Sequence, residues 1–562
     1  MPSEISRRRF LRDGSTGCLG LALLPALRVE AAPSFDWVLR GATVVDGTGG
    51  PLWSADLGVR GDTIAAIGSI DPAQGRRALD LSGLHLCPGF IDIHSHSDYS
   101  IRTYPGAESR ILQGVTTEIT GNCGASAAPL DGVDAARRRR EFFEQEGIEP
   151  DWTSVASYLE RLERGGIAAN QALLLGQGTL RENAIGNLDR PLSSEGLRGV
   201  LRALEQGLDE GAIGLSTGLE YTPGSYTPTE EIVALARVVA RYGGLYASHI
   251  RNEEAMLLEA VHEAIDIGRQ TACRVEISHL KAAGRPNWSK QGAALDLIED
   301  GRGDGIEVLA DAYPYTAYST GLTIFLDPPD REGGPAELVQ RLRDPARRAT
   351  LRSALPQRLE RDPGGPELVV IASVAGERNR ELVGKNLAEI GLHWKIDPAE
   401  ALLRLLEEEQ GAVSFIGHGM SAENVELVLR HPLVMIGSDG SSMAPVGLAA
   451  QQRPHPRSYG AFARVLGRFA REQKLLDLPA AVRKMTSMPA DQAGLRGRGR
   501  IARGAKADLV AFSAAEVRDR ADFDAPHQYA TGIANVWVGG VLAVESGKPT
   551  AARPGRVLRP NY

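Results

Sequence analysis

The middle of the chain alternates short apolar segments, each ending in polar residues, with longer segments of helical periodicity. Eight such apolar segments are predicted strands: Leu86–His96, Val115–Asn122, Ala172–Gln177, Ala212–Thr217, Gly244–His249, Arg274–His279, Ile306–Tyr313 and Leu433–Asp439. Eight β-α units over about 400 residues are typical of a (β/α)₈ barrel, which places the chain in the α/β class. We expect this TIM-like barrel to span residues 86–495.

Two regions depart from the barrel pattern. The interval between the seventh and eighth strands is too long for one crossover, so residues 322–412, rich in Pro, Arg and Glu, predict an inserted subdomain over the active-site face. Both ends of the chain instead carry short β-like pieces separated by glycines. We therefore predict one small β-sandwich domain built from both termini, residues 35–85 and 496–562.

The first residues, 1–31, match a bacterial twin-arginine export signal. Arginines at positions 7–9 precede a short apolar stretch, Cys18–Leu27, and a small-residue cleavage pattern ends at Ala31. The stretch is too short to span a bilayer, so we expect no stable membrane anchor. The sequence predicts a periplasmic or secreted mature protein, and a lipoprotein cut at Cys18 fits less well because Cys18 precedes most of the apolar stretch.

Composition excludes some classes of partner. The chain has 562 residues, of which 43% are hydrophobic, and a net charge of -8 that is modest for this size. Basic residues do not alternate with aromatics in a stripe, so nucleic acid is not an expected partner. The arginine run 137–140 is followed by Glu141 and Glu144, which favours a solvated helix face over a basic binding patch. Nothing in the composition indicates the oligomeric state.

Cysteine usage points to a chemical role for at least one thiol. Beyond the signal the chain keeps Cys87, Cys123 and Cys273, an odd number at wide spacing. Such a set is not a disulfide framework even in an oxidising compartment. One of the three therefore requires another explanation.

The ends of the predicted strands carry metal-ligating side chains. His94 and His96 follow the first strand at positions i and i+2, so both imidazoles lie on the same face. Other strands end in or run into further ligand types: Cys123, His249, His279 and Asp439. The carboxyl ends of barrel strands meet at one mouth, where these groups would converge. Imidazole and thiolate in this combination favour zinc with an open position for water.

Several stretches resemble the amidohydrolase superfamily and, within it, the D-aminoacylases (N-acyl-D-amino-acid deacylases). They are residues 89–98 (GFIDIHSHSD), 121–124 (GNCG), 216–221 (STGLEY), 248–253 (SHIRNE), 277–281 (ISHLK), 438–440 (SDG) and 504–510 (GAKADLV). The cysteine after the second strand is the most specific mark of that branch. Related hydantoinases and dihydroorotases are expected to bridge two metals with a carboxylated lysine on strand four, where this chain has none.

The resemblance implies roles for the metal ligands. Cys123, His249 and His279 would hold one tight zinc ion, and His94 and His96, with Cys123 bridging, a second and weaker one. Asp439 would act as general base and then general acid, because the proton gained in attack is the one returned on departure. The alternative role for Asp439 is to bind or orient the zinc ion without transferring a proton.

The resemblance also implies substrate-binding residues. Tyr313 would hydrogen-bond the developing oxyanion, and Lys281, Ser319 and Arg457 would surround the free carboxylate of the substrate. Arg457 lies in a loop that two prolines stiffen, and its alternative role is to form an ordinary salt bridge within that loop.

The expected function is zinc-dependent removal of the N-acyl group from small-molecule N-acyl-D-amino acids. A dipeptidase for C-terminal D-residues and a cyclic amidohydrolase remain alternatives on the same site. A non-catalytic metal-binding barrel is disfavoured by Asp439, since a pure binder needs no proton shuttle. Two departures from the resemblance, Gln177 where a histidine is expected and a less polar loop over 441–452, lie at the barrel mouth, where they affect substrate preference rather than metal chemistry.

Overall fold

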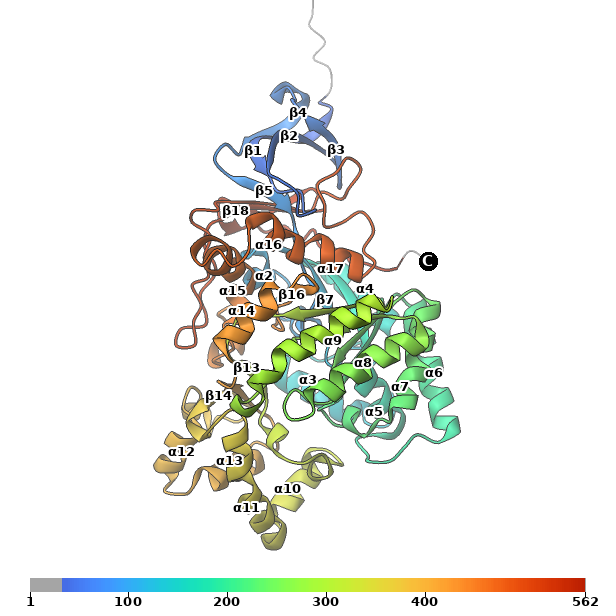
Figure 1. Cartoon of the computed structure of the whole chain (residues 1–562), viewed down its shortest axis with the longest axis vertical. Helices are drawn as coiled ribbons and strands as arrows, with labels where there is room; N and C mark the ends of the chain where they lie inside the picture. The colour runs from blue at the N-terminus through green and yellow to red at the C-terminus, as the bar shows by residue number, and fades with distance from the viewer. Residues whose placement is uncertain (1–32, 561–562) are drawn as a thin grey trace, which may run out of the picture.

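A computed structural model describes residues 33–560 and shows a closed parallel barrel at the centre of the molecule (Figure 1). Its eight strands pair in the order of the chain: β6 (Phe90–Asp92), β7 (Val115–Thr120), β8 (Asn170–Gly176), β9 (Gly214–Gly218), β10 (Leu245–His249), β11 (Arg274–Ile277), β12 (Val308–Ala312) and β16 (Val434–Ile436). A parallel bridge between Ser95 and Gly440 joins the first strand to the last just beyond their ends. The predicted (β/α)₈ barrel is therefore confirmed.

The barrel strands are apolar because both of their faces are covered. Every residue of β7, β8, β9 and β10 is buried, as expected for parallel strands enclosed by helices. The short helix α2 (Glu108–Ile111) lies between β6 and β7. The covering helices of the next six units are α4 (Val155–Gly165), α5 (Gln177–Ile185), α6 (Ser194–Asp209), α7 (Thr229–Arg241), α8 (Leu257–Thr271), α9 (Gln291–Gly303) and α14 (Ala422–Arg430). After β16 come α15 (Arg457–Arg464), a π-helix over Val465–Glu472, α16 (Leu478–Met485) and α17 (Ser487–Gln492).

The prediction of one continuous strand over residues 86–96 is wrong. The run contains two strands separated at Gly89, β5 (His85–Pro88) and β6, and they belong to different sheets. β5 pairs with β1 (Phe35–Val44) and with β17 (Leu509–Phe512), so the terminal sheet extends past the expected boundary at residue 85. A Cβ atom at Gly89 would lie 2.1 Å from the Thr116 hydroxyl oxygen, which explains why glycine stands at this junction.

Strands from both ends of the chain build one mixed sheet of nine strands. Its path is β20-β19-β18-β17-β5-β1-β2-β3, with β4 pairing to β1. The remaining strands are β2 (Trp53–Arg60), β3 (Thr63–Gly68), β4 (Gly75–Asp80), β18 (Ile533–Val538), β19 (Val541–Glu545) and β20 (Lys548–Pro549). Trp37 of β1 and Trp537 of β18 meet edge to face at 5.9 Å, so the two termini share one apolar core.

The long interval after β12 forms a subdomain at the opposite end of the molecule from the terminal sheet (Figure 1). It has a three-stranded antiparallel sheet, β13 (Tyr318–Gly321), β15 (Val413–Gly417) and β14 (Val369–Val374), in that order. Its helices are α10 (Pro335–Arg343), α11 (Pro345–Arg361), α12 (Leu387–Trp394) and α13 (Pro398–Glu408). The sheet includes residues on both sides of the expected range 322–412, because β13, which precedes that range, pairs with the central strand β15, which follows it.

The predicted export signal, residues 1–31, lies outside the residues that the structure describes. It stays a prediction, as does the periplasmic or secreted location. Among residues 33–560, no helix combines the length and apolar character needed to cross a bilayer.

Candidate metal centre

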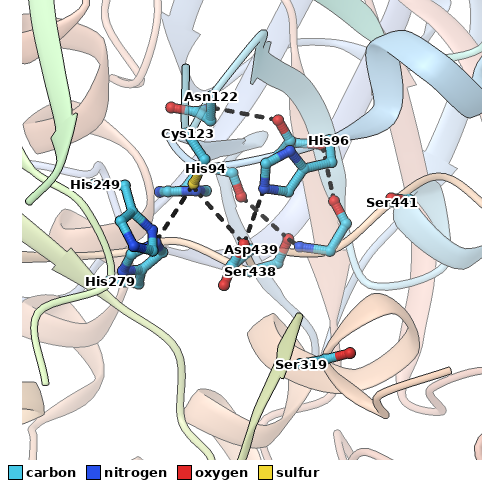
Figure 2. Close-up of polar contacts among 12 residues, drawn as sticks. His94, His96, Asn122, Cys123, His249, His279, Ser319, Ser438, Asp439 and Ser441 are labelled. Atoms are coloured by element: carbon cyan, nitrogen blue, oxygen red, sulfur yellow. Dashed lines mark hydrogen bonds and ion pairs between the residues drawn. The ribbon is translucent and has the colours of Figure 1, made fainter. Parts of the chain in front are cut away.

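Six predicted site residues converge at the carboxyl end of the barrel. They are His94 and His96 after β6, Cys123 after β7, His249 at the end of β10, His279 after β11 and Asp439 after β16. Figure 2 shows the Cys123 sulfur facing the His94 ring, with His249 and His279 on one side and Asp439 and His96 on the other. Six residues from five strands thus surround one small volume, as the strand-end pattern predicted.

The interatomic distances define two overlapping groups of ligand atoms. Cys123 Sγ lies 3.3 Å from His94 Nε2 and 3.4 Å from His279 Nε2. His249 Nδ1 lies 2.9 Å from His279 Nε2. In the first group His94, His96, Cys123 and Asp439 offer atoms within 4.8 Å of one another, and in the second Cys123, His249 and His279 do so. Cys123 belongs to both groups.

Three residues of this cluster have a strained backbone. Cys123, His279 and Asp439 have φ values of 53°, 36° and 51°, in the left-handed region that L-residues with side chains rarely adopt. Such conformations persist where the surrounding structure enforces them, and they gather at functional sites. Three ligand candidates with the same strain indicate that the fold aims these side chains at a common point.

Glycines on both sides of Cys123 make its turn possible. Gly121 has φ +76° and a Cβ there would lie 2.0 Å from the Leu174 carbonyl oxygen. Gly124 has φ +73° and a Cβ there would lie 2.5 Å from the Gly218 nitrogen. The Gly-Asn-Cys-Gly motif is therefore explained by close packing of this turn against β8 and β9.

The electrostatics of the cluster fit a bound cation. Burial opposes ionisation of Cys123, but the positive charges of His94 and His279 outweigh it and hold the pKa of the thiol well below its ordinary value. Burial likewise lowers the pKa of His249, yet Glu253 and Cys123 raise it to about 10. The site thus stabilises a thiolate by holding protons on neighbouring imidazoles. A divalent metal takes the place of such protons when thiolate and imidazole bind it.

Carboxylates behind the histidines orient three of the four rings. His94 Nδ1 lies 3.1 Å from Asp311 Oδ2, His279 Nδ1 lies 2.9 Å from Glu253 Oε1, and His249 Nε2 lies 3.4 Å from Glu220 Oε2. A carboxylate on the second ring nitrogen fixes the orientation of a metal-binding histidine. Sequence reasoning did not assign this role to Asp311, Glu253 or Glu220, although Glu220 and Glu253 lie in the motifs that carried the resemblance.

Asp439 lies between the histidines and a cation. Its Oδ1 is 3.0 Å from His96 Nε2 and 3.5 Å from His94 Nε2, and its Oδ2 is 2.7 Å from Arg457 Nη1. Burial opposes the charged form, but Arg457 and His96 keep the pKa of Asp439 well below its usual range. Arg457 and His96 therefore favour the charged form of this carboxylate beside the ligand cluster.

The four predicted substrate-binding residues lie next to the cluster. Tyr313 stands between two cations, with Arg457 Cζ 5.0 Å and Lys281 Nζ 5.8 Å from its ring centroid. Arg457 also donates from Nη2 to the Ser319 carbonyl oxygen at 3.3 Å. Lys281 Nζ pairs with Glu253 Oε1 at 2.5 Å. Arg457 thus does form a salt bridge, and its partner is Asp439 at the centre of the site.

A family model for the amidohydrolase family matches residues 77–544. The chain belongs to the amidohydrolase family. It is 38% identical over 526 residues to the N-acyl-D-glutamate deacylase of Alcaligenes xylosoxydans xylosoxydans, which covers 93% of this chain and 96% of that protein. The superfamily and the D-aminoacylase branch predicted from the motifs are therefore confirmed.

Two solved structures of this amidohydrolase group are similar over 94% of the chain and 100% of their own length. One is the N-acyl-D-glutamate deacylase of Bordetella bronchiseptica with zinc and a phosphonate inhibitor that mimics the tetrahedral intermediate, with a TM-score of 0.80 and 34% identity. The other is a D-aminoacylase with a binuclear metal centre, described as activated by one metal and attenuated by a second, with a TM-score of 0.79 and 34% identity.

Proposed function

We propose that this amidohydrolase is a zinc-dependent N-acyl-D-amino-acid deacylase. The observation that carries the proposal is the Cys123 thiol within 3.4 Å of His94 and His279, with Asp439 beside them at the barrel mouth. Relatives and solved structures similar over the whole barrel, named for deacylation of N-acyl-D-amino acids, support the same assignment. The tight metal ion is proposed on Cys123, His249 and His279, and a second, weaker one on His94, His96 and Cys123.

Zinc bound by this cluster would polarise the amide carbonyl of the substrate and lower the pKa of a water molecule. The protein would supply the proton transfers. Asp439 takes a proton from the water that attacks the carbonyl carbon and returns that proton to the leaving amine nitrogen. One carboxylate therefore serves both halves of the reaction. His96, bonded to Asp439 Oδ1, and Arg457, bonded to Oδ2, fix the direction of that carboxylate.

Substrate-side residues would hold the ends of the amide. Burial raises the pKa of Tyr313 well above its ordinary value, so its phenol stays neutral and keeps a proton to donate to a developing oxyanion. Arg457 and Lys281, on either side of Tyr313, would bind the free carboxylate of the amino acid. Ser319 lines the same space from β13 of the inserted subdomain.

Substrate class is tested with a panel at fixed enzyme and zinc concentrations. We expect hydrolysis of N-acetyl-D-amino acids to exceed that of hydantoins and of dipeptides with a C-terminal D-residue. Faster opening of a hydantoin would favour the cyclic amidohydrolase, and faster cleavage of the dipeptides would favour the dipeptidase. Zinc binding without turnover of any compound would identify a non-catalytic barrel.

An Arg457→Lys enzyme tests the carboxylate clamp. Lysine keeps the charge but loses the two-pronged donor, and a hydrogen bond between charged groups contributes about 1.5–3 kcal/mol. We expect KM for an N-acetyl-D-amino acid to rise about 10- to 100-fold. A fall in kcat accompanies it, because lysine no longer fixes the direction of the Asp439 carboxylate. The control is Arg464→Lys on the same helix, where Arg464 pairs with Asp519 at 2.6 Å. An unchanged KM in the Arg457 variant would contradict the clamp.

A further inference from the structure

Two cavities meet at the metal centre and extend in different directions. The larger, of about 430 Å³, opens past His96 and Cys123. The smaller, of about 70 Å³, opens past His249 and Lys281. His279, Ser319 and Asp439 line both cavities, so an amide bound at the cluster would have one arm in each.

The smaller cavity fits the amino-acid arm, given the proposed function. Lys281 and Tyr313 line it, and Arg457, which lines the larger cavity, pairs with Asp439 where the two cavities meet. Its outer wall comes from the inserted subdomain, with Ile324, Phe325 and Asp362 among its side chains. The acyl arm then extends past Cys123 into the larger cavity.

One part of the lining of the larger cavity is apolar. It includes Tyr99 of α1 (Ser97–Ser100), Ala127 and Leu130 of the loop after β7, and Phe142 of α3 (Ala135–Glu146). The rings of Tyr99 and Phe142 stack with centroids 5.8 Å apart, and Leu130 is only 2% exposed. This wall would bury an apolar chain and remove its surface from water.

Charged residues at the rim of this cavity are neutralised by neighbours. Arg138 donates to Asn183 Oδ1 at 2.5 Å and lies 3.6 Å from Glu182. Glu141 pairs with Arg137 at 2.5 Å. Arg457, which also lines this cavity, pairs with Asp439 at 2.7 Å and is assigned to the carboxylate of the amino acid. The lining therefore offers no further surplus charge that would select an ionised acyl group, so a neutral one fits best.

The larger cavity has a much greater volume than an acetyl group would fill. Pockets that enclose drug-sized ligands measure about 300–1,000 Å³, and this cavity lies in that range. A methyl group occupies a space comparable to one water molecule, roughly 30 Å³ of liquid. Acetyl would leave most of the apolar wall in contact with water.

We propose that the larger cavity is an acyl subsite and that the enzyme prefers N-acyl-D-amino acids whose acyl group is a neutral chain of medium length. The inference rests on the proposed deacylase function and adds the class of acyl group to it. Its test compares N-acetyl, N-hexanoyl and N-decanoyl derivatives of D-leucine. We expect kcat/KM to rise at least tenfold from acetyl to the better of the longer chains.

Filling the cavity from its exposed wall tests the assignment of the two arms. Ala125 lines the larger cavity and is exposed, so Ala125→Phe adds a ring to it with little cost to folding. We expect the decanoyl-to-acetyl ratio of kcat/KM to fall at least tenfold. Gln145→Trp, at a second exposed lining position, is expected to lower the same ratio. The matched control is Ala136→Phe on the exposed side of α3. We expect this variant to keep the wild-type decanoyl-to-acetyl ratio of kcat/KM.

The possible results separate this inference from the proposed function. Hydrolysis of no N-acyl-D-leucine, and of no other N-acetyl-D-amino acid in the panel above, would refute the deacylase itself. Hydrolysis of N-acetyl-D-leucine at a rate equal to or above that of both longer chains would refute the acyl subsite alone. A change in side-chain preference, rather than in acyl-length preference, in both filled variants would place the amino-acid arm in the larger cavity and overturn the assignment.

Discussion

An Asp439→Asn enzyme is expected to keep its zinc and to lose about 10²- to 10⁴-fold in kcat, the usual contribution of general acid–base catalysis. The amide has the size of the carboxylate and can still accept a hydrogen bond from His96, which lies 3.0 Å from Oδ1. It cannot take up a proton at neutral pH, so both attack and departure lose their shuttle. Zinc content by elemental analysis and steady-state kcat, measured on one preparation, test this prediction.

The control for this variant is Asp519→Asn. Asp519 pairs with Arg464, at the other end of the helix that begins with Arg457, so its loss removes a similar ion pair away from the metal centre. We expect its zinc content and kcat to match the wild type. Loss of zinc from the Asp439 variant would show that Asp439 is a metal ligand first, and full activity would contradict the proposed mechanism.

A Cys123→Ser enzyme is expected to lose at least 100-fold in zinc affinity and in activity at limiting zinc. Cys123 belongs to both ligand groups, so its replacement removes a ligand from both proposed metal positions. A hydroxyl ionises far less readily than the thiol, whose pKa the neighbouring imidazoles hold well below its ordinary value against the effect of burial. Calorimetric titration of the metal-free protein with zinc measures the affinity directly.

Two further variants calibrate the cysteine result. Cys273→Ser replaces a buried thiol that contacts the Gly244 carbonyl oxygen at 3.8 Å, away from the ligands, and should bind zinc like the wild type. His96→Ala removes a ligand from one group only and should retain the tight site. Equal zinc affinity in the Cys123 variant and the wild type would rule out the cysteine as a ligand.

The ligand cluster could be predicted from the sequence because each member lies at or just after a predicted strand. Alternation of apolar segments and helices located the strands, and parallel barrel topology then required their carboxyl ends to meet. The same reasoning does not specify distances. The left-handed backbone at Cys123, His279 and Asp439, which aims the three side chains, depends on packing between neighbouring strand ends.

Other features could not be predicted because they depend on contacts across the fold. The run around Gly89 is continuously apolar, so its division between two sheets has no signature in hydrophobic periodicity. Asp311, Glu253 and Glu220 are recognised as partners of the histidines only when their distances are known. The two cavities likewise combine residues distant in the chain, such as Tyr99 with Thr320.

The central claim is zinc-dependent hydrolysis selective for D-amino acids, and one measurement tests it most directly. The D and L enantiomers of one N-acetyl amino acid are offered to the metal-free protein and to the same protein reloaded with zinc. The account predicts release of the free amino acid from the D enantiomer alone, and only after zinc is restored. Equal hydrolysis of both enantiomers, or undiminished hydrolysis by the metal-free protein, would contradict it.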